Sequence, residues 1–431
     1  MQRQIKVVLV GAGNRADIYS SFSLKTPDRM KVVGIVEPDT GRMERMRQKY
    51  SVSPENCFTE LADFLKREKF ADAVINGTMD QLHVETSIPV LEAGYDLLLE
   101  KPFAVNEEEL RRLVKVANDC KRKVYICHVL RYTPFYSAIK RHLVNREIGD
   151  IISIEMCEHV NYHHMAVAYV RGKWRSPKIC FAPMLLAKSC HDMDIMMWMM
   201  SDTKPKVVHS YGSDIQFMPD KKPKEAGKRC MVDCPLNGEC AFSCEANYVA
   251  NPRWQAYVAR SIENDPSPEN IARSLREENP YGKCVWDFER DGNVDHQAVL
   301  INFENGVTGT FTMTGGAARS ERNIHIVGTK GEIKGTFEES KYILRKIAPY
   351  TKAGYEDTLI DLKVSGDMIG AYGAHGGGDG HMVYDFLDVL CGEEKPFSAT
   401  EINDSTVSHL VVFAAERARK SGTPQIMNLD V

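Results

Sequence analysis

Short apolar runs alternate with amphipathic stretches over the first 130 residues of the chain. Strands are predicted at the apolar runs 7–10, 31–36, 73–76, 96–99 and 124–129. The stretches between them have helical spacing, and Asn106 with Glu109 resembles a capping box at the start of one helix. Strands that alternate with helices form a parallel sheet whose carboxyl ends carry ligand-binding groups. The pattern therefore predicts a doubly wound α/β domain over residues 1–130.

The rest of the chain has a second pattern, in which apolar and polar residues alternate and β-branched residues are frequent. Strands are predicted at 151–156, 207–212, 297–303, 306–313 and 323–328. Asn305 and Gly306 form a strong hairpin signal between two of these strands. Residues from about 212 to 290 lack the pattern and are predicted to form an irregular insertion. Residues 131–431 are thus predicted to form a second domain built around a β-sheet.

Length and composition agree with two packed domains. The 431 residues exceed one ordinary hydrophobic core, and 43% of them are hydrophobic. A net charge of −4 without a basic stripe argues against a nucleic-acid partner. No apolar run approaches the roughly 18 residues that cross a bilayer, and no charged-then-apolar leader precedes the first strand. We therefore expect a cytoplasmic protein that does not interact with a membrane.

A glycine motif follows the first strand and indicates a dinucleotide site. Gly11 permits a tight turn, Gly13 lets the backbone approach a pyrophosphate, and Ala16 lets the next helix pack closely. Glu37 follows the second strand, where an acidic side chain binds ribose hydroxyls and repels a 2′-phosphate, which favours NAD over NADP. The candidate cofactor-binding residues lie in this turn and at later strand ends: Gly11, Gly13, Asn14, Arg15, Glu37, Thr78, His83, Glu100 and Lys101.

Three segments together resemble the Gfo/Idh/MocA oxidoreductases: GAGNRA (11–16), TMDQLHVETSIPVLEAGYDLLLEKP (78–102) and a later His191-x-x-Asp194. The resemblance implies an N-terminal Rossmann domain and a C-terminal α/β domain with a large, mostly antiparallel sheet. It also implies a homo-oligomer, a dimer or tetramer, that acts on sugars, inositols or related polyols with NAD or NADP. By the same resemblance Lys101 is the catalytic lysine, and a cis peptide bond precedes Pro102.

The chemistry of alcohol oxidation independently supports a role for Lys101. Removal of a hydride from a CH–OH carbon requires that the hydroxyl proton be taken up. A lysine, with an ordinary pKa of about 10.4, becomes a better base when burial and a positive nicotinamide lower that pKa. His191 is the candidate second acid or base, and Asp194, three residues later on the same helix face, would orient its imidazole.

The segment around His191 departs from the family pattern. Relatives usually have Asp-x-Gly-x-His-x-x-Asp, whereas Ala187 and Ser189 occupy the first two fixed positions here. Because the missing carboxylate normally contacts substrate hydroxyls, Lys188 or Asp192 is expected to supply another polar contact. The candidate substrate-binding residues follow the last strand of the first domain, precede or lie in the His191 segment, or belong to a late glycine loop. They are His128, Arg131, Tyr132, Trp174, Arg175, Lys188, Asp192, Asp194 and His375.

Four of the twelve cysteines form a cluster in the predicted insertion: Cys230, Cys234, Cys240 and Cys244. Four thiolates suit a structural zinc ion or, less well, an iron–sulfur cluster. Two disulfides would require an oxidising compartment, which the missing leader argues against. The other eight cysteines, among them Cys284, are scattered and predicted to be reduced.

These observations lead to one principal hypothesis and two alternatives. The principal hypothesis is an NAD-dependent oxidoreductase that acts on a CH–OH group of a sugar, a sugar derivative or an inositol, with Lys101 and His191 transferring the proton. The first alternative is a glycoside hydrolase that uses NAD for transient oxidation, elimination and re-reduction. The second is a nucleotide-sensing protein without turnover, against which the presence of Lys101 argues.

Overall fold

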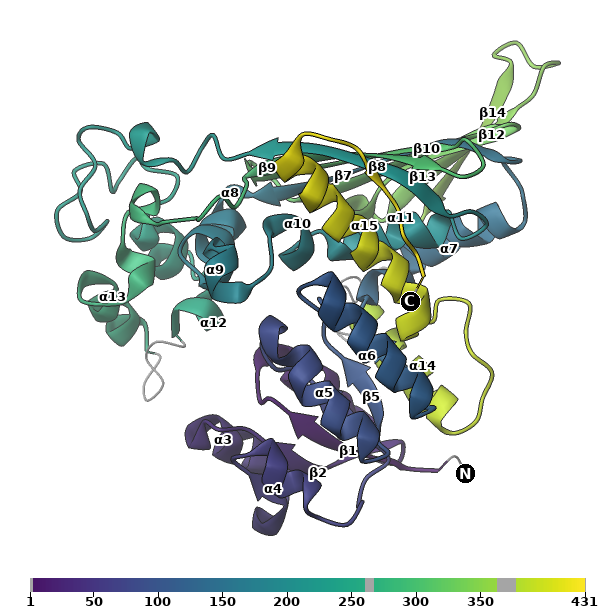
Figure 1. The fold of residues 1–431 in the computed structure, drawn as a ribbon. Coiled ribbons are helices and arrows are strands. Elements are labelled where there is room, and N and C mark those ends of the chain that lie inside the picture. Colours follow the sequence, from purple (N-terminus) through teal and green to yellow (C-terminus); the bar gives the residue numbers. More distant parts are fainter. Residues whose placement is uncertain (1–2, 260–266, 363–376, 431) are drawn as a thin grey trace.

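Two β-sheets, one in each predicted domain, organise the molecule (Figure 1). The structure is a computed structural model that describes residues 3–259, 267–362 and 377–430. A six-stranded sheet belongs to the N-terminal part, and a nine-stranded sheet belongs to the rest of the chain. The predicted α/β fold class is confirmed.

The first sheet is parallel throughout and has the strand order β3-β2-β1-β4-β5-β6. Its strands are β1 (Ile5–Val10), β2 (Met30–Val36), β3 (Cys57–Phe58), β4 (Ala73–Asn76), β5 (Asp96–Leu99) and β6 (Val124–Ile126). This order is that of the dinucleotide-binding doubly wound fold. The last strand is shorter than predicted because the chain turns into a 3₁₀ helix, η3 (Val129–Tyr132).

The helices of this part are α1 (Asn14–Ser20), α2 (Phe22–Lys25), α3 (Thr40–Tyr50), α4 (Leu61–Leu65), α5 (His83–Glu92) and α6 (Glu107–Asp119). Asn106 caps α6 as predicted, since its side chain accepts a hydrogen bond from the backbone N–H of Glu109 at 2.9 Å. The apolar face of α6 is buried against the sheet through Leu110 and Leu113. Local sequence signals therefore account for this helix.

The second sheet is mostly antiparallel, in the order β14-β13-β12-β11-β7-β10-β9-β8-β15, and only the β7–β10 pair among its described strands is parallel. Its strands are β7 (Ile151–Asn161), β8 (Pro205–Ser213), β9 (His296–Phe303), β10 (Thr308–Ala317), β11 (Glu321–Gly328), β12 (Gly331–Thr336), β13 (Lys341–Ile347), β14 (Tyr355–Asp361) and β15 (Gln425–Ile426). The predicted hairpin turn joins β9 to β10, with Gly306 at φ +88°.

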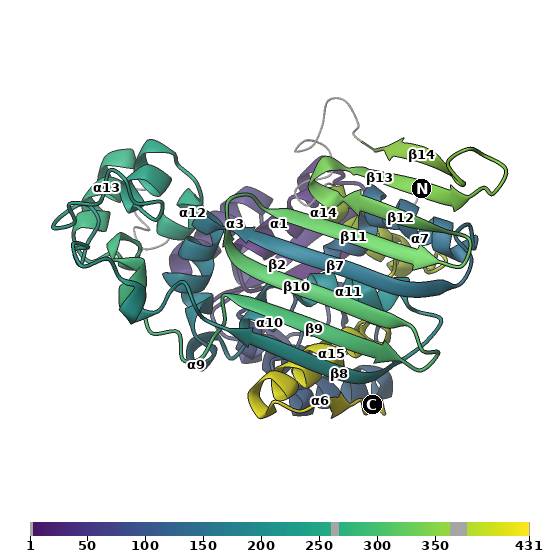
Figure 2. The same ribbon diagram turned by 90° about the horizontal axis from the view of Figure 1, so that it is seen from above.

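Helices cover one face of this sheet, and its other face is turned to the viewer without helices over it in Figure 2. The helices of this part are α7 (Pro134–Val144), α8 (Tyr162–His164), α9 (Pro177–Cys180), α10 (Met184–Ala187), α11 (Cys190–Met199), α12 (Gln255–Val258), α13 (Pro268–Arg276), α14 (Gly378–Leu390) and α15 (Ile402–Ser421). In the described parts of the chain, no helix has both the length and the hydrophobicity needed to cross a bilayer.

One late helix returns to the N-terminal sheet. Met382 and Phe386 of α14 are buried in one cluster with Ile5 of β1 and Leu98 of β5. The ring of Phe386 also lies 5.5 Å, centroid to centroid, from that of Tyr125. The first 130 residues therefore do not complete their own core, which the pattern along the chain did not predict.

Candidate active site

The turn between β1 and α1 has the geometry needed for close approach to a dinucleotide. Gly11 has φ +87°, and a Cβ there would stand 2.9 Å from the backbone nitrogen of Thr78. Across the turn, a Cβ on Gly77 would be 2.9 Å from that of Ala16, so helix and strand pack closely. A Cβ on Gly13 would have one described neighbour within 4 Å, the Gly77 oxygen at 3.5 Å. The open space beside Gly13, at a helix N-terminus, fits the pyrophosphate of NAD.

Glu37 directs its carboxylate at this turn. Its Oε2 accepts a hydrogen bond from the backbone N–H of Ala12 at 2.6 Å, and its Oε1 accepts one from Asp39 at 3.1 Å. The carboxylate thus lies next to the glycine turn, where an acidic residue of this fold binds the ribose of the dinucleotide. This position agrees with the expected preference for NAD.

The Glu100-Lys101-Pro102 segment follows β5 at the carboxyl edge of the sheet. The expected cis peptide bond is present between Lys101 and Pro102. His83, which was expected to bind the cofactor, is 1% exposed, and its Nδ1 lies 2.7 Å from the carbonyl oxygen of Pro102. In this structure His83 therefore supports the backbone that carries Lys101.

Glu100 and Arg15, also expected at the cofactor, form a polar network that holds this segment. Glu100 Oε1 accepts hydrogen bonds from Arg15 Nε at 2.7 Å and from the Tyr19 hydroxyl at 2.8 Å, while its Oε2 accepts the Lys101 N–H at 2.6 Å. Arg15 Nη2 lies 2.5 Å from Asp379 Oδ1 at the start of α14. Although burial raises the pKa of Glu100, Arg15 and Lys101 together hold it below its ordinary value. Glu100 is therefore an anion beside Lys101.

The Lys101 amine reaches across to the second domain. Its Nζ donates a hydrogen bond to the carbonyl oxygen of Ala187 at 3.1 Å. Burial alone lowers the pKa of this amine, but Cys190, Glu100 and Asp80 together raise it above its ordinary value. The protein groups around Lys101 thus raise its pKa, in contrast to the expected lowering, and keep the amine protonated at neutral pH.

His191 belongs to the same region, because it lies in the first turn of α11 (Cys190–Met199), four residues after Ala187. Its ring meets that of the fully buried His128 edge-on, with centroids 5.7 Å apart. Asp194, which was expected to orient the His191 imidazole, instead receives two hydrogen bonds of 2.6 Å from Arg131. The structure thus assigns Asp194 to an ion pair that the sequence did not predict.

Arg131 and Tyr132, which were expected to contact substrate, connect buried elements. Arg131 is 3% exposed and also donates to the carbonyl oxygen of Ala399 at 3.2 Å. The Tyr132 hydroxyl lies 3.0 Å from Thr400 Oγ1 and accepts the N–H of the same residue at 3.1 Å. Their partners come from the segment before α15, which is remote in sequence. In this structure both residues therefore contribute to packing.

Lys188 and Asp192 lie in a buried charge cluster with two residues that sequence reasoning missed, Glu158 of β7 and Arg322 of β11. Lys188 Nζ is 2.5 Å from Glu158 Oε1, and Arg322 Nε is 2.9 Å from Asp192 Oδ1. Arg322 also pairs with Glu158. Burial raises the pKa of the fully buried Asp192, and Glu158 raises it further, although Arg322 opposes the change. Asp192 therefore pairs with Arg322 in this structure, and its expected contact with substrate stays a prediction.

The sequence contained one signal for this cluster. Glu158 occupies an inward position of β7, on the face that also buries Ile154, Met156 and Val160. A carboxylate on the apolar face of an alternating strand requires a buried partner. No comparable signal marks Arg322, because the register of β11 against β7 decides what it meets.

Trp174 brings the second domain against the first, whereas Arg175 contacts residues of its own domain. Trp174 Nε1 donates to Asp80 Oδ2 at 2.8 Å, and Asp80 is one of the groups that raise the pKa of Lys101. The Arg175 guanidinium lies 5.8 Å from the centroid of the Phe288 ring.

Thr78, in the loop after β4, donates from its hydroxyl to Asn76 Oδ1 at 2.8 Å. His375, another candidate, lies outside the described residues.

The cysteine cluster does not form a ready-made metal site. In the parts of the chain that the structure describes, no three His, Cys, Asp or Glu side chains are arranged to hold an ion. All twelve cysteines are free thiols. The predicted ligand set Cys230, Cys234, Cys240 and Cys244 is therefore not supported as it stands.

Comparisons with known proteins cover nearly the whole chain. Residues 5–128 match a family model described as "Oxidoreductase family, NAD-binding Rossmann fold", and residues 140–423 match "Oxidoreductase family, C-terminal alpha/beta domain". YteT of Bacillus subtilis (strain 168), named as an oxidoreductase, is 25% identical over 90% of this chain and 92% of its own length. An inositol 2-dehydrogenase of Corynebacterium glutamicum (strain R) is 24% identical over 46% of this chain and 55% of its own.

Solved structures share the fold over the full length. The WlbA dehydrogenase of Chromobacterium violaceum, in complex with NADH and UDP-GlcNAcA, is 17% identical, with a TM-score of 0.66 over 100% of this chain and 98% of that one. An inositol dehydrogenase homolog from Azotobacter vinelandii, complexed with NAD⁺, is 15% identical, with a TM-score of 0.69 over 98% and 97% of the two chains.

Proposed function

The chain belongs to the Gfo/Idh/MocA family of NAD(P)-dependent oxidoreductases, and on that premise we propose that it transfers a hydride between NAD and a CH–OH carbon of a sugar, a sugar derivative or an inositol. The relative named inositol 2-dehydrogenase and the solved dehydrogenase with UDP-GlcNAcA support this substrate class. The position of Glu37 beside the glycine turn supports NAD rather than NADP.

One observation carries the proposal: the Lys101 amine, at the ligand-binding edge of the first sheet, contacts the segment that holds His191. Lys101 Nζ donates to the Ala187 oxygen at 3.1 Å, and His191 follows four residues later. An amine and an imidazole from different domains thus flank the same region. This is the arrangement that proton transfer to and from a bound alcohol requires.

In the proposed reaction, bound NAD supplies the hydride acceptor, and the side chains move the proton. Lys101 Nζ takes the hydroxyl proton during oxidation and returns it during reduction. The Glu100 anion stabilises the ammonium form, while Arg15 and Tyr19 hold the Glu100 carboxylate in place. His191 is the second proton-transfer group. Burial keeps the pKa of the neighbouring His128 well below its ordinary value, so His128 contributes no positive charge there.

A substrate panel tests the proposal. Purified protein with NAD⁺ and individual sugars, polyols and inositols should form NADH in proportion to the substrate consumed. NADH production would be absent, and free sugar would be released from an aryl glycoside, if the protein were a redox-neutral glycosidase. Dinucleotide binding in calorimetry without turnover of any substrate would indicate a sensor. Failure of both NAD⁺ and NADP⁺ to bind would contradict every dinucleotide-based hypothesis.

The two directions of the reaction should depend oppositely on pH. Since neighbouring anions raise the pKa of Lys101, the amine is protonated at neutral pH and must lose its proton before it can act as a base. At saturating NAD⁺, kcat/KM for oxidation should therefore rise as the pH increases above neutrality. At saturating NADH, kcat/KM for reduction should fall over the same range. Initial rates measured from about pH 6 to 10 at constant ionic strength check the direction of both changes, since ordinary histidine and lysine pKa values are about 6.5 and 10.4. Parallel profiles in the two directions would contradict a proton role for Lys101.

We further propose that the protein is a cytoplasmic homo-oligomer that uses the uncovered face of the nine-stranded sheet. That face carries exposed apolar side chains, among them Tyr211 of β8 and Leu300 of β9. Exposed apolar groups on a sheet face favour association with another protein surface.

A further inference from the structure

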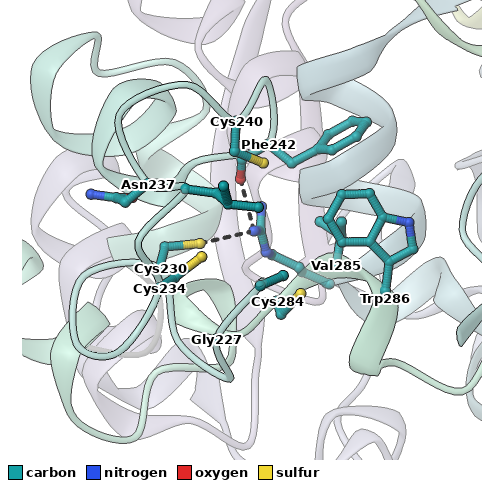
Figure 3. A pocket seen from close by; sticks show the side chains of 12 residues that line it. Gly227, Cys230, Cys234, Asn237, Cys240, Phe242, Cys284, Val285 and Trp286 are labelled. Carbon is teal, nitrogen blue, oxygen red and sulfur yellow. Dashed lines mark hydrogen bonds between the residues drawn. The ribbon is translucent and has the colours of Figure 1, made fainter. Parts of the chain in front are cut away.

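Four cysteine thiols line one small cavity in the insertion. The cavity has a volume of about 20 Å³, and Cys230, Cys234, Cys240 and Cys284 contribute to its wall (Figure 3). A space of this size accommodates about one water-sized particle. It therefore suits a single ion and excludes a larger organic ligand. Cys244, which the spacing along the chain had suggested, is fully buried but does not line the cavity.

The backbone brings the segments of Cys230 and Cys284 together, although they are remote in sequence. The N–H of Cys230 donates to the carbonyl oxygen of Gly282 at 3.1 Å, and the N–H of Cys284 donates to that of Lys228 at 2.9 Å. These bonds form an antiparallel bridge between the two segments. Cys234 and Cys240 lie in the turns that follow Cys230, so all four thiols are presented by short, closely connected loops.

A buried cation lies against the same cavity. Arg171 is 2% exposed, and its Nη2 lies 3.6 Å from Cys230 Sγ. Its other hydrogen bonds go to the carbonyl oxygens of Lys283 and Phe242 and to the Tyr248 hydroxyl, so no carboxylate in the described chain is bonded to it. A buried guanidinium requires a negative partner. Sulfur atoms in the thiolate form would provide one.

We propose that Cys230, Cys234, Cys240 and Cys284 bind one structural zinc ion. Each thiol loses its proton on binding, so Zn²⁺ and four thiolates form a closed site with a net charge of −2. Arg171 offsets part of this charge and donates to a ligand sulfur, as groups around zinc sites do. Four thiolates so close together would repel one another without a cation, so loss of the thiol protons is coupled to binding of the ion.

The ion would stabilise a segment that reaches the active site. Arg171 directly precedes the turn that holds Trp174, and Trp174 Nε1 donates to Asp80 of the first domain at 2.8 Å. Arg171 in the cavity wall and Trp174 in this interdomain contact are thus only three positions apart in the chain. We assign the zinc a structural role, because all four ligand positions are filled by protein sulfur and none remains for substrate.

Two matched substitutions distinguish the proposed ligand set from the one suggested by spacing. Cys284→Ser and Cys244→Ser each replace one largely buried thiol, at 6% and 0% exposure. Untagged wild-type protein and C244S should each contain one zinc per chain by mass spectrometric elemental analysis. Loss of a group around a zinc site already costs about 10–100-fold in affinity, so C284S should bind zinc at least about 100-fold more weakly. Its thermal unfolding temperature should fall to that of chelator-treated wild-type protein.

Wild-type protein alone provides a second measurement in case C284S does not fold. Replacement of zinc by Co²⁺ should produce the visible absorption of a tetrahedral ion and intense thiolate-to-cobalt charge-transfer bands. Zinc in C284S but not in C244S would overturn the ligand set. Wild-type protein without any metal, with iron in place of zinc, or with a disulfide between two of the four cysteines would overturn the zinc assignment. None of these outcomes depends on the substrate or on catalytic activity.

Discussion

Substitution of Lys101 by methionine is expected to lower kcat by about 10²–10⁴-fold, the range that a general acid–base group contributes. Methionine retains the length of the side chain but cannot accept or donate the substrate proton. The fold should persist, because within the described residues the Lys101 side chain makes one hydrogen bond, to Ala187, while the surrounding backbone is held by Glu100 and His83. Steady-state kinetics on the substrate identified by the panel, together with NAD⁺ calorimetry, measure the effect.

Lys115 provides a matched control, because it is an exposed lysine on α6 that pairs with Asp119. K115M should have wild-type kcat and wild-type affinity for NAD⁺. His191→Asn should also lower kcat substantially while preserving NAD⁺ binding, since His191 is the second proposed proton-transfer group. Wild-type turnover in K101M would show that Lys101 is not the proton-transfer group, even if the substrate assignment held.

Substitution of Arg131 by methionine is expected to destabilise the protein by about 3–5 kcal/mol, the usual effect of removing one partner from a buried ion pair. The change leaves the Asp194 carboxylate buried without the two 2.6 Å hydrogen bonds that it now receives. It also removes the link from Arg131 to the Ala399 oxygen. Urea unfolding at constant pH measures the loss in free energy of unfolding.

The cost of the Arg131 substitution should depend on pH in a defined direction. Burial raises the pKa of Asp194 above its ordinary value even though Arg131 opposes the change, so removal of Arg131 raises that pKa further. A group with a raised pKa in the folded state binds more protons folded than unfolded, and stability falls as the pH rises. R131M should therefore be less destabilised at about pH 5 than at about pH 8.

An exposed ion pair supplies the contrast for this prediction. Arg345 of β13 makes two hydrogen bonds to Asp357 of β14 near the surface. Solvent screens such pairs, so R345M should have a much smaller effect on urea unfolding than R131M. Equal effects of the two substitutions would show that burial does not determine the contribution of the Arg131–Asp194 pair.

Periodicity and strand ends made most of the fold predictable. The apolar runs and helical spacings identified the strands of the first sheet except the short β3 (Cys57–Phe58), and the two-residue alternation identified the principal strands of the second. The glycine turn and the Glu100-Lys101-Pro102 segment could be placed for the same reason. Each is a local backbone feature directly after a strand, and the carboxyl ends of parallel strands meet at one edge. The sequence by itself therefore determined the fold class, the cofactor edge and the position of Lys101.

Tertiary structure alone decided which polar groups meet. Asp194 lies 63 positions from Arg131, and Asp192 lies 130 positions from Arg322. Cys284 lines the cysteine cavity beside a bridge between two segments that are distant in the chain. Spacing along one helix or loop led instead to the pairing of His191 with Asp194 and to Cys244 as the fourth cysteine of the cluster. Local periodicity specifies the direction of a side chain within its own element. The group that it faces depends on strand register and on the packing of elements far apart in the chain.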